Sequence, residues 1–372
     1  MKRIVIDARE SGTTTGRYVD KLVEYLHRLR PTFAEELDIV ILTKTHRVDF
    51  MHAIAPKFEV VATPYAEFSF GEQLGFRRQI EGLKPDLVHF GMVQQPVWYE
   101  GPVVTTMHDL TTIRFRNPSK NLLVFTIKQS IYKWVNKRVA HKSAQLITPT
   151  EFVKQDVAEY TGADPAKITV TLESADHITD KPRALQSLSG DDFLMYVGRP
   201  LPHKNLQQLI NAFAIIKDSH PQLKLVLVGK QDANYVALGQ SVHARHLNDV
   251  VFTGFASEGQ LRWLYENCQA YAFPSLSEGF GLPGLEAMMH GAPVVASNAT
   301  CIPEVLGNAA HYFDPLDVDD MAAKIAEVLD DKKLRTHLIK AGRARVKKFS
   351  WERMAEQTLG VYKDVLTRDA SK

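Results

Sequence analysis

Short apolar runs rich in Val and Ile alternate with amphipathic stretches of helical length along nearly the whole chain. This alternation is typical of parallel βαβ units, in which a helix returns the chain to the same edge of the sheet after each strand. The alternation predicts an α/β fold. The succession of strands and helices occurs twice, once in each half of the chain. In the first half the expected strands are Arg3–Ala8, Ile39–Thr43, Val60–Thr63, Leu87–Phe90, Val103–Met107 and Gln145–Pro149. In the second half they are Phe193–Val197, Leu223–Val228, Val250–Thr253, Ala270–Pro274, Pro293–Ala296 and His311–Phe313.

A polar, interrupted stretch at 177–192 separates the two series and is typical of a linker. The 372 residues are enough for two domains. We therefore expect two doubly wound, Rossmann-like domains over 1–176 and 193–350. Trp351–Leu366 is predicted to be a closing helix, with Ser350 as its N-cap. Because open parallel sheets bind ligands at the carboxyl ends of their strands, we expect the site in loops that follow strands.

Composition excludes several classes of protein. The net charge of +2 gives no field for nucleic acid, so we expect no nucleic-acid partner. Cys268 and Cys301 cannot form a zinc site alone, and their apolar surroundings indicate buried, reduced thiols. Asp7 interrupts the first apolar run, which is too short for a signal peptide, and no run is long enough to span a bilayer. A cytoplasmic protein is expected, with association to a membrane surface left open.

The densest motif is EGFGLPGLEAMMHGAPVVAS, which begins at Glu278 directly after an expected strand. A helix is expected to open at about Leu282, and Gly279, Gly281 and Gly284 are expected to permit unusual backbone angles and close approach of a ligand. The free N–H groups of such a helix start attract a phosphate. The alternative is a plain helix N-terminus with acidic residues that complement its dipole.

Two carboxylates flank this loop, because Glu278 lies before the helix and Glu286 lies within it. Carboxylates accept hydrogen bonds from hydroxyl groups. A ligand with hydroxyls on both sides of a diphosphate fits this order, and a nucleotide sugar is such a ligand. Arg199 and Lys204, in GRPLPHKNL after another strand, supply the cations that a diphosphate needs. The alternative for that pair is a solvated loop.

The motif EGFGLPGLEAMMHGAPVVAS, the segment GRPLPHKNL and the closing FSWERMAEQTLGVY resemble the GT-B glycosyltransferase family 4. The resemblance covers nearly the whole chain and implies two facing Rossmann-like domains, with 351–372 packing back on the first. It implies retaining transfer from a nucleotide-diphosphate sugar, with no cofactor and no metal. The implied roles are ribose binding by Glu286, hexose binding by Glu278, diphosphate binding by Arg199, Lys204 and the Gly281–Leu282 amides, and further donor contacts from Gly279, Phe280 and the backbone near Phe255.

The first half matches that family more loosely. His108, in VTTMHD after a strand, resembles a family histidine beside the donor sugar; it can donate to a sugar hydroxyl or help to stabilise a cation-like transition state. The alternative is a histidine satisfied by local hydrogen bonds, and Asp109 is expected to orient it or to cap the next segment. Gly16 lies in the loop that approaches phosphate and acceptor in relatives, but threonines stand where relatives have adjacent glycines. After the expected strand Thr169–Leu172, this chain has Glu173-Ser-Ala-Asp176 in place of the usual Asn-Gly pair.

The segment Leu110–Thr150 contains no Asp or Glu. A basic amphipathic helix of this kind can lie on anionic lipid or bind an anionic acceptor. The alternative is a core-packing helix with a solvated basic face. Its basic residues are Arg114, Arg116, Lys120, Lys128, Lys133, Lys137, Arg138 and Lys142, and its apolar residues include Leu122, Leu123, Val124, Phe125, Ile127, Ile131, Tyr132 and Trp134.

The expected function is therefore metal-independent, retaining transfer of a hexosyl group from UDP- or GDP-hexose to a glycan or lipid-linked acceptor, as in polysaccharide biosynthesis. No DxD motif stands in a loop after a strand, since Asp191-Asp192 precedes a strand and Asp319-Asp320 lies in a late helix. Two alternatives stay open: a nucleotide-sugar epimerase, and a binding protein whose catalytic site has decayed.

Overall fold

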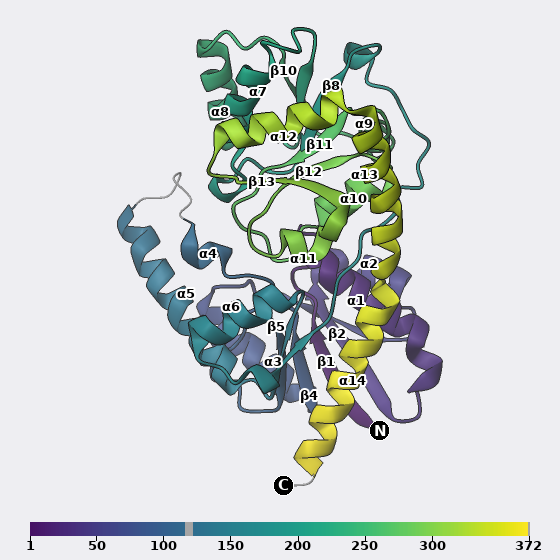
Figure 1. Ribbon diagram of the computed structural model, residues 1–372. Coiled ribbons are helices and arrows are strands. Elements are labelled where there is room, and N and C mark those ends of the chain that lie inside the picture. The colour runs from purple at the N-terminus through teal and green to yellow at the C-terminus, as the bar shows by residue number, and fades with distance from the viewer. Residues whose placement is uncertain (116–121, 371–372) are drawn as a thin grey trace. The chain divides into compact units, whose positions relative to one another are not determined.

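Figure 1 shows the computed structural model of the chain, which describes residues 1–115 and 122–370. The chain divides into two compact units. The first unit comprises Met1–Ile113, Lys120–Glu173 and Ser350–Lys372, and the second comprises Arg114–Ser119 and Ser174–Phe349.

The first unit is built on a seven-stranded parallel sheet in the order β3-β2-β1-β4-β5-β6-β7. Most of the strands are buried because their side chains are covered on both faces, as an all-parallel sheet requires, whereas the edge strand Glu59–Thr63 is only partly buried. They are β1 (Lys2–Asp7), β2 (Leu37–Lys44), β3 (Glu59–Thr63), β4 (Leu87–Phe90), β5 (Val103–Thr106), β6 (Gln145–Thr148) and β7 (Ile168–Val170). Its helices are α1 (Gly16–Leu29), α2 (Val48–Ile54), α3 (Arg77–Gly82), α4 (Thr111–Arg114), α5 (Leu122–Lys142), α6 (Glu151–Thr161) and α14 (Trp351–Ala370).

The second unit has a six-stranded parallel sheet in the order β10-β9-β8-β11-β12-β13. Its strands are β8 (Phe193–Val197), β9 (Lys224–Val228), β10 (Val250–Gly254), β11 (Ala270–Phe273), β12 (Val294–Ser297) and β13 (Ala310–Phe313). Its helices are α7 (Leu206–Ile216), α8 (Ala233–Ala244), α9 (Glu258–Asn267), α10 (Leu282–Met289), α11 (Ile302–Leu306), α12 (Val318–Asp330) and α13 (Lys332–Arg345).

Both sheets confirm the predicted doubly wound fold. In each, the strand order reverses beside the first strand, between β1 and β4 and between β8 and β11. Loops that leave neighbouring strands in opposite directions open a crevice at this point, where such folds bind their ligands. The loops after β1, β4, β8 and β11 are therefore the ones that position a site.

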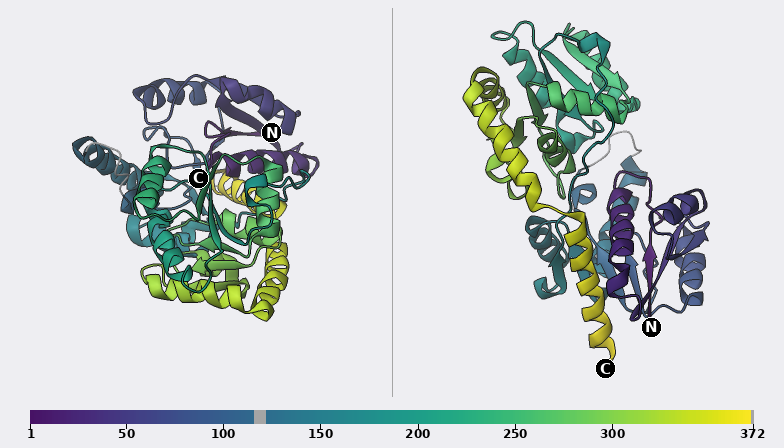
Figure 2. Two further views of the ribbon diagram at one scale, coloured as in Figure 1. Left: turned by 90° about the horizontal axis from the view of Figure 1, so that it is seen from above. Right: turned by 90° about the vertical axis from the view of Figure 1, so that its right-hand side faces the viewer.

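The last helix, α14, packs on the first unit, where it runs beside α1 (Figure 2). Ser350 caps it, since its Oγ accepts a hydrogen bond from the Arg353 amide at 3.3 Å. On the face of α14 that packs inward, Ala355 and Tyr362 are fully buried and Leu359 is 8% exposed. The helix is also fastened by a polar contact, because Tyr362 Oη lies 2.6 Å from Nδ1 of the buried His89.

The stretch 177–192 is held against α9 by hydrogen bonds from both backbone and side-chain donors. Arg183 donates its amide to the Gly259 carbonyl at 2.9 Å, and the Arg262 guanidinium donates to the carbonyls of Ile178 and Asp180. Cys268 and Cys301 are buried thiols that are not joined in a disulfide, as the sequence predicts. No helix within residues 1–115 and 122–370 is long and apolar enough to cross a membrane.

Candidate active site

In the second unit, the loop after β11 leads directly into α10, which begins at Leu282 as predicted. Gly281 is the N-cap and has a φ of 91°, in the left-handed region that side chains disfavour. A Cβ at this position would lie 3.2 Å from a ring carbon of Phe273, so close packing also favours glycine. Gly284 donates its amide to the Gly281 carbonyl at 3.0 Å, which leaves the Gly281 and Leu282 amides before the first hydrogen bond of α10, at a helix end that favours a phosphate.

Gly279 and Gly284 do not have the backbone role that the sequence suggested. Neither Gly279 nor Gly284 has a positive φ. Gly284 lies in the first turn of α10, where a Cβ would come within 3.0 Å of Leu306 Cδ2. That glycine is therefore required for packing of α10 against α11, and of the three glycines Gly279, Gly281 and Gly284 only Gly281 supplies the unusual backbone angle.

Glu278 and Lys204 form a direct ion pair, with Lys204 Nζ at 2.7 Å from Glu278 Oε1. Both side chains are largely buried, with Lys204 19% exposed and Glu278 10% exposed. Lys204 ends the short turn Pro202–Lys204 before α7, and the Glu278 amide donates to Thr300 Oγ1 at 3.2 Å. The structure thus brings together Glu278, the residue predicted to bind the hexose, and Lys204, a residue predicted to bind the diphosphate. The two are 74 residues apart in the sequence.

Arg199 lies after β8 and is 62% exposed. Its Nη2 lies 3.2 Å from Oδ2 of Asp232, a residue that the sequence analysis missed. Asp232 also caps α8 by accepting from the amides of Asn234 and Tyr235. Although burial opposes it, the Tyr235 amide and the Arg199 guanidinium lower the pKa of Asp232, so this carboxylate stays charged beside Arg199. Asp is a common residue at helix N-caps, which was the available signal.

Glu286 lies in α10, where its Oε2 accepts from the hydroxyl of Tyr265 at 3.3 Å. Tyr265 is fully buried and stacks on the His290 ring with an interplanar angle of 8°. Burial, followed by the charge of Glu286, raises the pKa of Tyr265 well above its ordinary value, so the phenol remains a donor. Tyr265 therefore orients the carboxylate, and its position in α9 gave no sequence signal.

The other residues of this unit that are predicted to contact the nucleotide-sugar donor differ in solvent exposure. Phe280 is 5% exposed, with its ring edge-on to Phe349 at 5.6 Å, so its backbone is the part left for a ligand. Leu282 is half-buried at the start of α10. Phe255, after β10, is 84% exposed and follows Gly254, whose φ is 71°.

In the first unit, His108 follows β5 and is held by two acceptors. Its Nε2 lies 2.9 Å from the Gly91 carbonyl oxygen, and its Nδ1 lies 3.3 Å from Oε1 of Glu173. The Tyr18 ring packs edge-on against it at 4.8 Å. This is the local satisfaction described as the alternative from sequence, and contact of His108 with a donor stays a prediction. Asp109 caps the next segment by accepting from the Thr111 amide at 2.7 Å.

These two acceptors determine the charge of His108. A carbonyl and a carboxylate each need an N–H, so both contacts are satisfied only by the imidazolium. Burial lowers the pKa of His108, but the hydrogen bond and charge of Glu173 outweigh it and the net shift is upward. Glu173 begins the segment that stands where relatives were expected to have an Asn-Gly pair, and the sequence analysis gave it no role.

Gly16 is the first residue of α1, and its position has a steric explanation. A Cβ there would lie 1.7 Å from the Glu10 carbonyl oxygen, so no other residue fits without moving the loop. Contact of Gly16 with a donor stays a prediction.

Two parallel sheets of this topology, with ligand-binding loops at their switch points, define the GT-B class of glycosyltransferase fold. The family description "Glycosyl transferases group 1" matches residues 178–345, and "Glycosyltransferase Family 4" matches residues 15–172. The chain therefore belongs to the group 1 glycosyltransferases of family 4, and it is a glycosyltransferase.

Individual relatives agree with this assignment. The chain is 31% identical over 271 residues to O-antigen chain mannosyltransferase B of Escherichia coli, with 70% of each chain covered. It is 29% identical over 280 residues to MMP alpha-(1->4)-mannosyltransferase of Mycolicibacterium hassiacum, covering 73% of this chain and 67% of the relative. Among solved structures, Anabaena HepE in complex with UDP-glucose has a TM-score of 0.74 at 17% identity, covering 98% of this chain and 100% of that one. This last likeness concerns the fold.

Proposed function

We propose that this glycosyltransferase moves a hexosyl group from UDP- or GDP-hexose to a hydroxyl of a glycan or lipid-linked acceptor, with retention of configuration and without a metal ion. The names of the two relatives favour a mannosyl group as the first to test. The complex of the structural neighbour with UDP-glucose supports a nucleotide-sugar donor.

The Lys204–Glu278 pair beside the α10 N-terminus carries the proposal. A diphosphate at the Gly281 and Leu282 amides would attract the Lys204 ammonium by charge, and the hexose hydroxyls would donate to the Glu278 carboxylate. The ion pair thus holds the ammonium and the carboxylate in place for a ligand that carries a diphosphate next to a hydroxylated sugar. Glu286, oriented by Tyr265, would accept from the ribose hydroxyls.

In this proposal the leaving diphosphate is stabilised electrostatically by Arg199, Lys204 and the helix amides as negative charge develops on it. The acceptor hydroxyl attacks from the face that the diphosphate leaves, and a departing phosphate oxygen takes its proton. No cluster of three or more His, Cys, Asp or Glu is placed to hold a metal within the described ranges 1–115 and 122–370. Metal independence is a separate part of the proposal, and continued turnover in EDTA tests it.

Lys204→Ala tests the proposal at its centre. Loss of the ammonium removes a charged contact to the leaving group, so kcat is expected to fall by about 100-fold, as for loss of one oxyanion donor. Lys217→Ala is the matched control, because Lys217 is also 19% exposed and also pairs with a carboxylate, that of Asp249. Wild-type turnover by Lys204→Ala would remove Lys204 from the diphosphate site.

We also propose that α5 lies against an anionic membrane surface. Its described part exposes Lys128, Lys133, Lys137 and Arg138 together with Ile131 and Trp134, at 57% and 51% exposed. Arg116 and Lys120 lie outside the described residues, as do the side chains of Leu122, Leu123, Val124, Phe125 and Ile127. Salt-sensitive co-sedimentation with phosphatidylglycerol vesicles, weakened in Trp134→Ala, is the expected result; equal binding to neutral vesicles would contradict it.

A further inference from the structure

His290, the C-cap of α10, is enclosed between two aromatic rings and is not among the proposed donor contacts. Its side chain is buried. On one side its ring stacks on Tyr265 of α9, with 5.8 Å between the ring centroids. On the other side lies the ring of His177, with the centroids 4.7 Å apart. The imidazole therefore has little room to move, and it holds the Tyr265 ring in place.

His290 also acts on the carboxylate that is proposed to bind the ribose. Glu286 and His290 are four residues apart, so their side chains lie on the same face at the end of α10. Tyr265 contacts both, since its hydroxyl donates to Glu286 Oε2 at 3.3 Å while its ring stacks on His290. A shift of the Tyr265 ring would move the hydroxyl away from the carboxylate. The position of Glu286 therefore depends on His290 through Tyr265.

The same imidazole binds the linker segment 177–192. Its Nε2 accepts a hydrogen bond from the Ile178 amide at 3.2 Å. Arg262 of α9 donates to the Ile178 carbonyl at 3.2 Å, so side chains of the second unit bind both polar groups of this residue. Ile178 lies near the start of the stretch Ser174–Phe349, directly after the chain leaves the first unit at Glu173. His290 thus connects the linker to the proposed ribose site.

The contact with Ile178 requires a neutral imidazole. Because Nε2 accepts a hydrogen bond, the proton of the ring lies on Nδ1, which has no partner among the residues that the structure describes. Burial, followed by the charge of His177, lowers the pKa of His290 to about 4. Among the facing groups of α9, Arg262 adds to this shift and Glu266 opposes it. The ring is therefore neutral near pH 7, and the contact with Ile178 is intact.

We propose that His290 is a positioning residue that couples nucleotide binding at Glu286 to the order of the linker segment. A ribose on Glu286 immobilises the carboxylate, the Tyr265 ring and His290, and so favours the contact with Ile178. Conversely, the Ile178 contact holds His290 and preorganises Glu286 for the ribose. Coupling between two binding events is reciprocal, so each favours the other by the same factor. This role rests on the proposed function, because it needs a nucleotide whose ribose binds Glu286.

Hydrogen exchange of the Ile178 amide, measured by NMR on the full chain with and without UDP or GDP, tests the proposal. Saturating nucleotide is expected to slow this exchange about fivefold in the wild type, the effect of one side chain that no longer has to be immobilised on binding. His290→Phe keeps a flat ring beside Tyr265 and removes the acceptor. Its Ile178 amide should exchange faster and no longer respond to nucleotide, and its Kd for the nucleotide should rise by the same factor, about fivefold.

Tyr265→Phe breaks the coupling at its other end and keeps the ring packing. Without nucleotide, the Ile178 amide of this variant should exchange as in the wild type, and added nucleotide should leave the rate unchanged. His311→Phe is the matched control, since His311 belongs to the same unit and its Nε2 also has a hydrogen-bond partner, Glu327 Oε2 at 2.7 Å. The control should bind nucleotide and protect Ile178 like the wild type.

Three results would overturn the proposed role of His290: a bound nucleotide that leaves Ile178 exchange unchanged in the wild type, slowing that persists in Tyr265→Phe, or wild-type nucleotide affinity in His290→Phe. Calorimetric titration of the wild type with UDP and GDP tests the proposed function separately. If a nucleotide binds and Ile178 does not respond, only the role of His290 fails. If neither nucleotide binds, the proposed function fails as well.

Discussion

Two histidines of the first unit interact electrostatically and differ in protonation: His108 is protonated and His89 is neutral. His108 contacts two acceptors and its pKa is raised, whereas His89 contacts the hydroxyls of Tyr362 and Thr106. Burial, followed by the charge of His108, lowers the pKa of His89 to about 3. Each hydroxyl can donate or accept, so the neutral ring of His89 is satisfied without a proton from solvent. The proton therefore resides on His108.

Glu173→Gln is predicted to lower the pKa of His108, because burial then acts without a facing carboxylate. Asp109 is the other carboxylate that raises this pKa, and it remains in the variant. An NMR titration of the His108 ring protons measures the change. Glu151→Gln, at an exposed carboxylate of the same unit, is the control and should leave the titration unchanged; an unchanged His108 pKa in Glu173→Gln would contradict the assignment.

The same substitution has a pH-dependent effect on stability. A histidine whose folded pKa is raised stabilises the fold below its unfolded pKa of about 6.5, and this contribution is lost as pH rises through the folded value. Glu173→Gln should therefore destabilise the chain more in mild acid than in mild alkali. His89 acts in the opposite direction, since its lowered pKa costs stability as pH falls below about 6.5.

At the scale of elements, α14 is attached by a polar contact as well as by apolar burial. Tyr362 and His89 are fully buried and separated by 273 residues of sequence. The ring of His89 also packs edge-on to the Tyr362 ring at 5.5 Å. The contact fixes the position of α14 over the sheet, because a slid helix would leave a buried imidazole nitrogen unpaired.

Tyr362→Phe removes that hydroxyl and leaves Nδ1 of His89 without its partner. The expected cost is about 1–3 kcal/mol, the usual penalty of a buried unsatisfied group. Hydrogen exchange of the α14 and α1 amides should accelerate correspondingly. Tyr25→Phe, on α1, is the control for loss of a tyrosine hydroxyl; protection in Tyr362→Phe equal to wild type would show that apolar packing alone holds α14.

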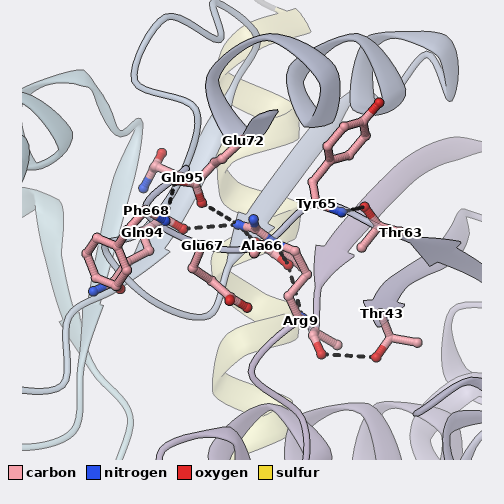
Figure 3. A network of polar contacts seen from close by, with 12 residues as sticks. Arg9, Thr43, Thr63, Tyr65, Ala66, Glu67, Phe68, Glu72, Gln94 and Gln95 are labelled. Carbon is pink, nitrogen blue, oxygen red and sulfur yellow. Dashed lines mark hydrogen bonds and ion pairs between the residues drawn. The ribbon is translucent and has the colours of Figure 1, made fainter. Parts of the chain in front are cut away.

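For the molecule as a whole, the sequence predicted the fold well, because hydrophobic periodicity and turn residues are local signals. Leu87–Phe90 and Phe193–Val197 have the predicted bounds, and the α10 start at Leu282 is correct. The site was predicted less fully. The Lys204–Glu278 pair and the Arg9–Glu72 pair, which Figure 3 shows, join distant segments, and no local pattern encodes which carboxylate meets which cation. Gly284 was expected to supply an unusual backbone angle, because packing against Leu306 leaves no sequence signal.

The central claim is that one pocket of the second unit binds a diphosphate between two carboxylates, and a crystal structure of the chain soaked with its cognate nucleotide sugar tests it most directly. Thermal-shift screening over UDP-, GDP- and ADP-sugars identifies that donor, because a bound ligand stabilises the folded state. The account predicts phosphates against the Gly281 and Leu282 amides and Lys204, with Glu286 on the ribose and Glu278 on the hexose. Phosphates bound away from the α10 N-terminus would contradict it.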